Sequence, residues 1–340
     1  MRTDDFNYHL PPERIAQTPV EPRHASRLLV LNQDQDELTH THFANLGDYL
    51  NPGDLLVVNQ TRVIPARLYA KKVPSGGRVE LLLLNRRDDS TWEALIGGKR
   101  MVAGKAFTLE NGIKGEVIEE LDGPRRLLRF AQPIDDSLEE LGEAPLPPYI
   151  HTPLNDAERY QTVYAREAGS AAAPTAGLHF TPELMSSLKD KGVGFAEVTL
   201  HVGLDTFAPV HEDDPREHAI HSEWCQLTKE TADKINAVKE NGGRVVAVGT
   251  TSVRVLESAT RQTQTGQSIA PYEGATSLYI LPGYEFKVVD AIITNFHLPR
   301  STLLMMISAF AGRDRILHAY ATAIEQEYRF YSFGDAMLIL

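Results

Sequence analysis

Two patterns of apolar residues alternate along most of the chain. Short apolar runs at residues 55–58 and 244–248 are typical of strands that are buried on both faces. Other segments have helical spacing, for example residues 181–192, where a Thr-Pro pair opens the helix and Leu184 and Leu188 share one side. Strands that alternate with helices predict an α/β fold with a largely parallel sheet or barrel.

The same patterns predict the remaining elements of this α/β part. Capping residues such as Thr228 and Ser301, and stop signals such as Gly312, set the ends of several helices. We expect short helices at 43–50 and 156–161 and longer ones at 229–241, 253–261, 302–311 and 313–327. Further strands are expected at 28–31, 195–202, 223–227, 277–281, 287–293 and 337–340.

The pattern changes near Ala66, after which only strands and turns are indicated as far as about Gln132. Turn residues rich in Gly, Asp and Asn separate the runs at short, regular intervals, which is the signature of a small β-barrel or sandwich. The six expected strands are 67–72, 77–85, 92–96, 106–109, 114–119 and 126–130. Residues 146–150, Leu-Pro-Pro-Tyr-Ile, form a stiff exit linker. We therefore divide the chain into a barrel-like α/β catalytic domain, residues 1–66 and 151–340, and an inserted β-barrel domain with its linker, residues 67–150.

Composition narrows the class of protein. The 340 residues contain 42% hydrophobic and 24% charged residues, which is ordinary for a globular protein. The single cysteine, Cys225, excludes an internal disulfide and favours a reducing compartment. The N-terminus lacks a signal-peptide core, and the most apolar run, residues 302–311, is half the length of a membrane span. We expect a cytoplasmic protein.

The charge is distributed unevenly along the chain. The net charge of −12 argues by itself against a nucleic-acid partner. Residues 62–129, however, hold 14 Lys or Arg against 9 Asp or Glu, out of 34 and 46 in the chain. An acidic enzyme with a neutral-to-basic module explains this equally well without nucleic acid.

Polar clusters follow several of the predicted strands. Since the carboxyl ends of parallel strands lie at one edge of a sheet, these clusters would converge there. They comprise Asn59, Gln60, Thr61 and Arg62; Thr175, Gly177 and His179; His201 and Asp205; Gly249, Thr250, Thr251, Ser252 and Arg254; and Asn295, His297 and Arg300. For the first cluster, a turn that only hydrogen-bonds itself is an equally good interpretation.

The segment Gly249–Ser252 precedes a helix and resembles an anion site, with backbone N–H groups and hydroxyls at a positive helix end. It lacks the Lys-Ser/Thr pair of a Walker loop and the spacing of a dinucleotide fingerprint. Taken alone, a simple helix cap is the better interpretation of this segment.

Histidines are candidates for acid–base chemistry, because their side chains titrate near neutral pH. His179, His201 and His297 all fall at predicted strand ends, which favours a function over a structural role. A zinc site at His211, His218, His221 and Cys225 is not indicated, because their spacing matches no standard finger and an acidic loop interrupts it. A Ser-His-Asp hydrolase is not indicated either, because the G-x-S-x-G motif is missing.

Six long motifs carry a resemblance to a known family. They read NQTRVIPAR (59–67), PTAGLHFT (174–181), HVGLDTF (201–207), GTTSVR (249–254), NFHLPRSTL (295–303) and YSFGDAM (331–337). In this order they resemble the S-adenosylmethionine:tRNA ribosyltransferase-isomerases of queuosine biosynthesis, a transferase family that modifies tRNA. The resemblance covers essentially the whole chain, from Phe6 to Leu340.

The resemblance implies a reaction and a fold. Members of the family transfer the ribosyl part of S-adenosylmethionine to 7-aminomethyl-7-deazaguanine at the tRNA wobble position. The sugar is isomerised to an epoxy-cyclopentanediol, which gives epoxyqueuosine-tRNA, and adenine and methionine leave. S-adenosylmethionine is thus a consumed substrate, and neither a metal nor a redox cofactor is implied. The family fold, a barrel-like α/β domain with an inserted β-barrel, agrees with the break near Ala66.

The implied chemistry suggests roles for the rim residues. A base must remove the proton at the 5′-carbon that the sulfonium acidifies, and the departing adenine needs a proton donor. We assign acid–base roles to His179, His201 and His297, with Asp205 binding hydroxyls or orienting a histidine. The remaining candidates bind substrate: Asn59, Thr61, Arg62, Thr175, Gly177, Gly249, Thr250, Thr251, Arg254, Asn295 and Arg300.

The tRNA is expected to contact the inserted domain, since phosphates bind Lys and Arg. The candidates are Lys71, Lys72, Arg86, Arg87, Lys99 and Arg100, although an ordinary solvated β-surface explains any one of them nearly as well. We expect a monomer. Two other functions stay open at this point: an S-adenosylmethionine-dependent tRNA methyltransferase, which would release S-adenosylhomocysteine, and a non-catalytic tRNA-binding protein.

Overall fold

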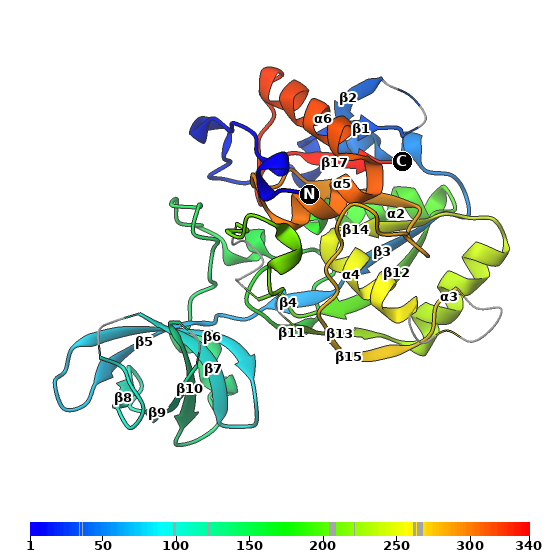
Figure 1. Cartoon of the computed structure of the whole chain (residues 1–340). Helices are drawn as coiled ribbons and strands as arrows, with labels where there is room; N and C mark the ends of the chain where they lie inside the picture. The colour runs from blue at the N-terminus through cyan, green and yellow to red at the C-terminus, as the bar shows by residue number, and fades with distance from the viewer. Residues whose placement is uncertain are drawn as a thin grey trace.

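A large mixed sheet and a separate small barrel dominate the structure (Figure 1). The computed structural model describes residues 1–33, 35, 37–97, 100–121, 123–203, 209–220, 222–260, 263 and 268–340. The large sheet contains β1 (Arg27–Leu31), β2 (Leu38–His42), β3 (Leu55–Asn59), β12 (Gly194–Leu200), β13 (Glu223–Leu227), β14 (Val245–Val248), β15 (Tyr272–Thr276), β16 (Ala291–Asn295) and β17 (Ala336–Ile339).

The centre of the large sheet is parallel and its margins are antiparallel. The strand order is β15-β13-β12-β3-β14-β16-β17-β1-β2. Strands β12, β3, β14 and β16 run parallel to one another, and β17 runs parallel to β1. Strands β13, β15 and β2 are added antiparallel, as is β17 against β16. The carboxyl ends of four adjacent central strands therefore lie at one edge of the sheet.

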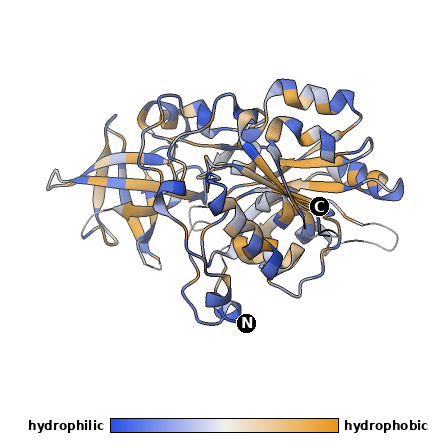
Figure 2. Cartoon of the chain, turned by 90° about the horizontal axis from the view of Figure 1, so that it is seen from above, coloured by the Kyte–Doolittle hydropathy of each residue, from blue (hydrophilic) through white to orange (hydrophobic). Residues whose placement is uncertain are grey.

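Both faces of the large sheet are covered, which explains the unbroken apolar run of β3. Leu55 and Val57 belong to the hydrophobic core beneath α3 and α4, whereas Leu56 and Val58 belong to the core beneath α2. Successive side chains of a strand point to opposite faces, so both sets must be apolar. Figure 2 shows the same result as orange strands enclosed by helices of mixed colour.

Most helices belong to this α/β part, and their capping residues are those that the sequence indicated. Thr181, Thr228 and Ser301 each accept a hydrogen bond from the backbone of the first helical turn. The α-helices are α1 (Asp135–Leu141), α2 (Pro182–Asp190), α3 (Lys229–Glu240), α4 (Thr250–Ala259), α5 (Thr302–Ala311) and α6 (Arg313–Glu325). Short 3₁₀ helices lie at Thr3–Phe6, Pro12–Arg14, Arg23–Ala25, Phe43–Tyr49, Ala157–Tyr160, Thr175–His179 and Pro215–Glu217.

The inserted segment forms a closed six-stranded barrel, at the lower left of Figure 1. Its strands are β5 (Arg67–Lys72), β6 (Arg78–Arg86), β7 (Thr91–Gly97), β8 (Ala106–Leu109), β9 (Lys114–Glu120) and β10 (Arg125–Phe130), in the order β10-β7-β6-β5-β8-β9. Its own hydrophobic core includes Trp92, Phe107 and Phe130. All six strands were predicted.

The two chain segments that connect the barrel with the large sheet lie side by side. Strand β4 (Thr61–Val63) precedes the barrel and β11 (Glu167–Ser170) follows it, and the two pair in parallel. Arg67 and Glu143 form an antiparallel bridge in which each backbone N–H donates to the other residue's carbonyl oxygen. The chain therefore leaves and returns at one place.

The α/β class and the inserted β-barrel are confirmed. The large sheet is a mixed sheet whose order ends at β15 and β2, so the expectation of a largely parallel sheet holds only for its centre. Among the described residues, no helix has the length and apolar character that a membrane span requires.

Two predicted strands are wrong because side chains capture their backbone groups. The carboxylate of Glu257 accepts hydrogen bonds from the backbone N–H groups of Lys287, Val288 and Val289, so strand β16 starts only at Ala291. The strand expected at 277–281 is also absent. Its place beside β13 is taken by Tyr272–Thr276, and the carbonyl oxygen of Leu278 accepts from Arg254 Nε instead.

Candidate active site

Polar residues from four parallel strands meet at the carboxyl edge of the large sheet. Asn59 ends β3 and Asn295 ends β16, while His201 follows β12 and Gly249 follows β14. This is the convergence that the positions of the polar clusters predicted. The loop after β11 joins them, because the 3₁₀ helix Thr175–His179 packs against β16.

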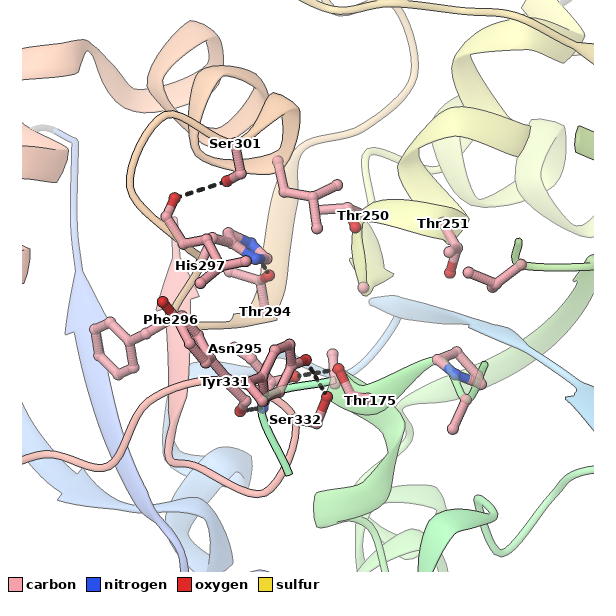
Figure 3. Close-up of a pocket in the computed structure, with 18 residues that line it drawn as sticks. Thr175, Thr250, Thr251, Thr294, Asn295, Phe296, His297, Ser301, Tyr331 and Ser332 are labelled. Atoms are coloured by element: carbon pink, nitrogen blue, oxygen red, sulfur yellow. Dashed lines mark hydrogen bonds between the residues drawn. The ribbon is translucent and has the colours of Figure 1, made fainter. Parts of the chain in front are cut away.

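A small cavity of about 60 Å³ opens at this edge (Figure 3). Hydroxyl, amide and imidazole groups surround it, from the loops after β11, β14 and β16 and from the segment before β17. The residues labelled in Figure 3 are Thr175, Thr250, Thr251, Thr294, Asn295, Phe296, His297, Ser301, Tyr331 and Ser332. We call this the inner cavity.

Asn295 joins three parts of the inner cavity. Its Oδ1 accepts a hydrogen bond from Thr175 Oγ1 at 3.0 Å. Its Nδ2 lies 3.2 Å from the ring nitrogen Nε2 of His179 and 3.2 Å from the carbonyl oxygen of Tyr331. The side chain is buried, so each of these contacts is worth more than it would be in water.

His179 lies behind the cavity wall rather than in it. Its two ring nitrogens are taken up by Ser26 Oγ, at 2.8 Å, and by Asn295. Burial lowers the pKa of His179 to about 3, and the positive charges of Arg23 and Arg329 act in the same direction. His179 is therefore neutral at physiological pH and orients Asn295.

His297 lines the inner cavity directly. Its Nε2 lies 2.8 Å from Thr294 Oγ1, and its backbone N–H donates to the hydroxyl of Tyr320 at 2.8 Å. Burial lowers the pKa of His297 to about 3. A neutral imidazole beside the cavity can accept a proton or hydrogen-bond a hydroxyl group.

His201 stands at the edge of the sheet between two partners. Its Nδ1 lies 2.8 Å from Thr61 Oγ1, and its ring stacks on Trp224 with ring centres 5.2 Å apart. A Cβ atom at Gly169 would come within 2.8 Å of the ring, so this position must be glycine. Burial lowers the pKa of His201, although the charge of Glu167 opposes this.

Helix α4 directs its N-terminus towards the inner cavity. Gly249 provides the left-handed turn before it, with φ of 87°, and lines the cavity with Thr250 and Thr251. Thr251 Oγ1 is buried and has no hydrogen-bond partner in the described chain. An unpartnered hydroxyl beside a positive helix end is a candidate ligand for an anionic group.

Arg254 lies one turn further along α4 and is already neutralised. Its guanidinium forms a buried ion pair with Glu223 and also donates to the carbonyl oxygens of Thr276 and Leu278. Glu223 in turn accepts from the backbone N–H of Gly203 at 2.8 Å. This pair fixes the end of β12 against β13.

Four other predicted substrate ligands have structural partners or lie elsewhere. Asn59 bonds the backbone of Leu200 and so ties β3 to β12, and Gly177 packs against the hydroxyl of Tyr164. Arg62 pairs with Glu158, and Arg300 lies nearest to Asp4. None of these four residues lines the inner cavity.

Some predicted residues lie outside the described residues. They are Asp205, expected in catalysis, Lys99, expected to contact tRNA, and His221.

A larger cleft of about 470 Å³ lies between the barrel and the large sheet. Arg86 and Arg87 line it on the barrel side, and Trp224 lines it on the sheet side. Thr250, Thr251 and Leu303 line both this cleft and the inner cavity, so the two are adjacent. We call it the outer cleft. The other described candidates for tRNA contact, Lys71, Lys72 and Arg100, are not among its lining residues.

Several cavity residues were missed from the sequence. Tyr331 and Ser332 open a motif that was recognised but received no role. Tyr149, from the proline-rich exit linker, hydrogen-bonds Ser332 at 2.7 Å and packs on Tyr331 with ring centres 4.7 Å apart. A hydrophobic, stiff linker was the available signal that this segment packs against the main domain.

The described residues contain no group of three or more His, Cys, Asp or Glu side chains placed to hold a metal ion. His218 hydrogen-bonds Glu212 at 2.9 Å. Cys225 lies in the core, where burial raises the pKa of its thiol to about 12.

Fold and site together define an α/β protein with an inserted β-barrel and a polar cavity at the carboxyl edge of its sheet. The queuosine biosynthesis protein family matches residues 3–339. Proteins named S-adenosylmethionine:tRNA ribosyltransferase-isomerase from Desulfitobacterium hafniense and Carboxydothermus hydrogenoformans are each 53% identical to this chain over the full length of both. The relative of that name from Clostridioides difficile is 51% identical, also over the full length of both.

A solved structure agrees with these relatives. The crystal structure of the S-adenosylmethionine tRNA ribosyltransferase from Thermotoga maritima is 42% identical, covers 99% of this chain and 100% of its own, and has a TM-score of 0.58. The chain belongs to the queuosine biosynthesis protein family.

Proposed function

We propose that this protein is an enzyme that transfers and isomerises the ribosyl group of S-adenosylmethionine onto 7-aminomethyl-7-deazaguanine at the tRNA wobble position, releasing adenine and methionine. The observation that carries this proposal is the match to the ribosyltransferase-isomerases over the full chain, at 53% identity. The site is compatible with it, because five of the six motifs, from residues 174–181, 201–207, 249–254, 295–303 and 331–337, contribute to the inner cavity. The same comparisons favour neither a methyltransferase nor a binding protein.

In this proposal, His297 and His201 act as the acid and base of the reaction. The reaction requires removal of a proton from the 5′-carbon and donation of a proton to the departing adenine. His297 lines the cavity as a neutral ring, and we propose that it accepts the proton. The burial that lowers its pKa also makes it a weak base in the protein without substrate. The Nδ1 of His201 is occupied by Thr61, and the ring edge that carries Nε2 lies against Gly169. His201 lines neither the inner cavity nor the outer cleft, so its proposed role requires substrate to reach the edge of the sheet beside them. Asp205 keeps its proposed role of binding hydroxyls or orienting a histidine.

We propose that the N-terminus of α4 binds the methionine carboxylate of S-adenosylmethionine. Thr250 and Thr251 offer hydroxyls, and the first backbone N–H groups of the helix are free of intrahelical partners. Arg254 supports this site indirectly, since Glu223 already balances its charge. Thr175 and Asn295 are placed to bind the ribose hydroxyls from the opposite side of the cavity.

The tRNA is proposed to approach through the outer cleft. Arg86 and Arg87 are the described candidates that line it, and both are more than two-fifths exposed. Lys71, Lys72 and Arg100 would contact phosphates further from the reacting base. Steeply salt-dependent binding that weakens when these charges are reversed is the expected behaviour.

A product assay tests the reaction. The protein is mixed with S-adenosylmethionine and a tRNA that carries 7-aminomethyl-7-deazaguanine, and adenine, methionine and the tRNA mass are measured by mass spectrometry. We expect release of both small products, together with a ribosyl-sized mass gain on the tRNA. The control is the same tRNA with guanine at the wobble position. Release of S-adenosylhomocysteine would contradict the proposal and indicate a methyltransferase.

Three further properties follow from the proposed reaction. The enzyme needs no resident cofactor, because S-adenosylmethionine itself is consumed. Its tRNA substrate places it in the cytoplasm. We propose a monomer, which light scattering would check.

A further inference from the structure

We propose that Trp224 stacks on the reacting wobble base while that base occupies the outer cleft. This inference rests on the proposed function, because it assumes that the substrate is a tRNA. It adds a nucleobase-binding residue that none of the sequence motifs contains.

Trp224 is more exposed than its place in strand β13 requires. Glu223 and Cys225 of β13 are buried, whereas Trp224 and the preceding Ser222 are exposed; Ser222, Glu223 and Trp224 all line the outer cleft. The indole is 39% exposed, and it is the only aromatic among the large hydrophobic residues exposed in the described chain. Its cross-strand partner on β15 is the small Ala275, which leaves the ring uncovered on that side. An exposed tryptophan in a cleft is typical of a binding site.

The ring is held in one orientation from behind. His201 stacks on one face of the indole, with ring centres 5.2 Å apart and 20° between the planes. His201 is itself fixed by Thr61 and by the close backbone of Gly169. Among the described residues no aromatic ring stacks on the second face of the indole, and we assign that face to the ligand. Because the ring is already ordered, stacking costs little conformational entropy.

The opposite wall of the cleft carries three arginine side chains, each of which is paired with a carboxylate. Arg87 and Arg125 both pair with the buried carboxylate of Glu93, at 2.8 and 3.3 Å. Arg86 lines the same wall and pairs with Asp89 and Asp135. A single-stranded nucleotide presents a flat base and a phosphate at once, and an aromatic ring facing arginines matches both.

S-adenosylmethionine also carries an adenine, so the fluorescence test below includes it as a competing ligand for Trp224. The outer cleft is also adjacent to the inner cavity, because Thr250, Thr251 and Leu303 line both. A base stacked on Trp224 therefore lies next to the place where the sulfonium substrate is proposed to bind.

Fluorescence tests the contact directly. The chain has two tryptophans, and Trp92 is buried in the barrel core with an indole nitrogen that has no partner. In a Trp92→Phe variant, Trp224 is the only reporter. We expect its emission to be quenched by an anticodon stem-loop RNA and not by a blunt RNA duplex of equal length. Equal quenching by both RNAs, or quenching by S-adenosylmethionine alone, would overturn the inference.

Kinetics provide the second test. Trp224→Leu should raise KM for the modified tRNA about tenfold or more, the effect of losing one stacked base, while KM for S-adenosylmethionine stays unchanged. Trp224→Phe and Trp224→Tyr should keep most of the affinity, because they keep an aromatic face. A merely structural role through His201 would instead lower kcat at unchanged KM for tRNA, and that result would refute the stacking role.

Two arginine variants, one in the cleft and one outside it, test the role of charge. Arg87→Gln should weaken tRNA binding and reduce its salt dependence, whereas Arg129→Gln, an exposed residue of β10 that does not line the cleft, should change neither. If the wild-type protein releases no adenine, the proposed reaction fails, and the fluorescence test still decides whether Trp224 binds RNA. If the enzyme is active and the stem-loop leaves Trp224 unquenched, the stacking role alone is wrong.

Discussion

Nδ2 of Asn295 lies 3.2 Å from Nε2 of His179, which fixes the tautomer of a buried histidine. The amide nitrogen can only donate, so Nε2 accepts, and the ring proton lies on Nδ1, from which it reaches Ser26 Oγ at 2.8 Å. His179 is thus a fully bonded neutral ring that holds Asn295 in place. Asn295 in turn positions Thr175 in the inner cavity.

Asn295→Ala should therefore lower kcat by about 100-fold or more, because it releases groups on both sides of the cavity at once. Adenine release under saturating substrate measures the effect. Asn45→Ala is the matched control, since Asn45 is exposed, its amide donates to Thr41, and its loss should leave turnover unchanged. Wild-type turnover in Asn295→Ala would show that Asn295 does not organise the site.

His297→Gln should reduce turnover about 10²- to 10⁴-fold, the usual contribution of a general acid or base. The fold should persist, because Gln retains a polar group near Thr294. His318→Gln, on the exposed side of α6, is the control and should retain full activity. The same replacement at His179 and at His201 should also lower turnover. Full activity in all three variants would remove the histidines from the mechanism.

Stability should fall as the pH is lowered below about 6.5. The pKa values of His179 and His297 lie near 3 in the folded protein and near their ordinary 6.5 in the unfolded chain. Between these values the unfolded chain binds more protons, so each histidine lowers the free energy of unfolding by about 1.4 kcal/mol per pH unit on acidification. Urea unfolding at pH 7.5, 6 and 5 measures the slope. It should be smaller in His297→Gln, and an unchanged slope would argue against a buried neutral ring.

Thr251→Val separates binding from stability. Removing a buried hydroxyl without a partner should leave the free energy of unfolding unchanged or raise it by up to about 1 kcal/mol. If that hydroxyl binds the substrate carboxylate, KM for S-adenosylmethionine should rise about 10- to 100-fold. Ser308→Ala removes another unpartnered buried hydroxyl, on α5 and away from the inner cavity, and should leave KM unchanged. Equal KM values in the two variants would exclude Thr251 as a ligand.

Gly177→Ala should lower the free energy of unfolding by about 1–3 kcal/mol, because the added methyl group would lie 2.0 Å from the hydroxyl of Tyr164. Thermal denaturation measures the loss. Gly203→Ala is the control for the substitution itself, since the nearest described atom to its added methyl group would be Glu223 Oε1 at 3.9 Å. A Gly177→Ala variant as stable as the wild type would show that Tyr164 can move aside.

Local patterns were sufficient to predict most elements of the fold. The six barrel strands and the capped helices follow from turn residues, alternation and caps, which act over a few residues. The strands at 277–281 and 287–293 were misplaced because distant side chains, Arg254 and Glu257, take their backbone groups. No local pattern reports a partner some thirty residues away.

The sequence predicted the location of the candidate site more accurately than the residues that line it. The convergence of Asn295 and Gly249 follows from the parallel order of β14 and β16, which the sequence indicated, whereas Thr175 reaches the cavity from the loop after β11. In the sequence, Arg62 and Arg300 are equally plausible substrate ligands, yet neither lines the inner cavity. Which way a side chain points depends on a one-residue difference in register, and the sequence pattern leaves that unspecified.

The bridge between Arg67 and Glu143 has a consequence for the origin of the chain. Because the barrel leaves and returns at one point, beside the paired strands β4 and β11, the surrounding sheet is continuous on either side of it. Removing the barrel would leave the order and pairing of the strands in the large sheet unchanged. An ancestral sheet could acquire such a module in one genetic step and gain a wall for a cleft without any change in the order of its own strands.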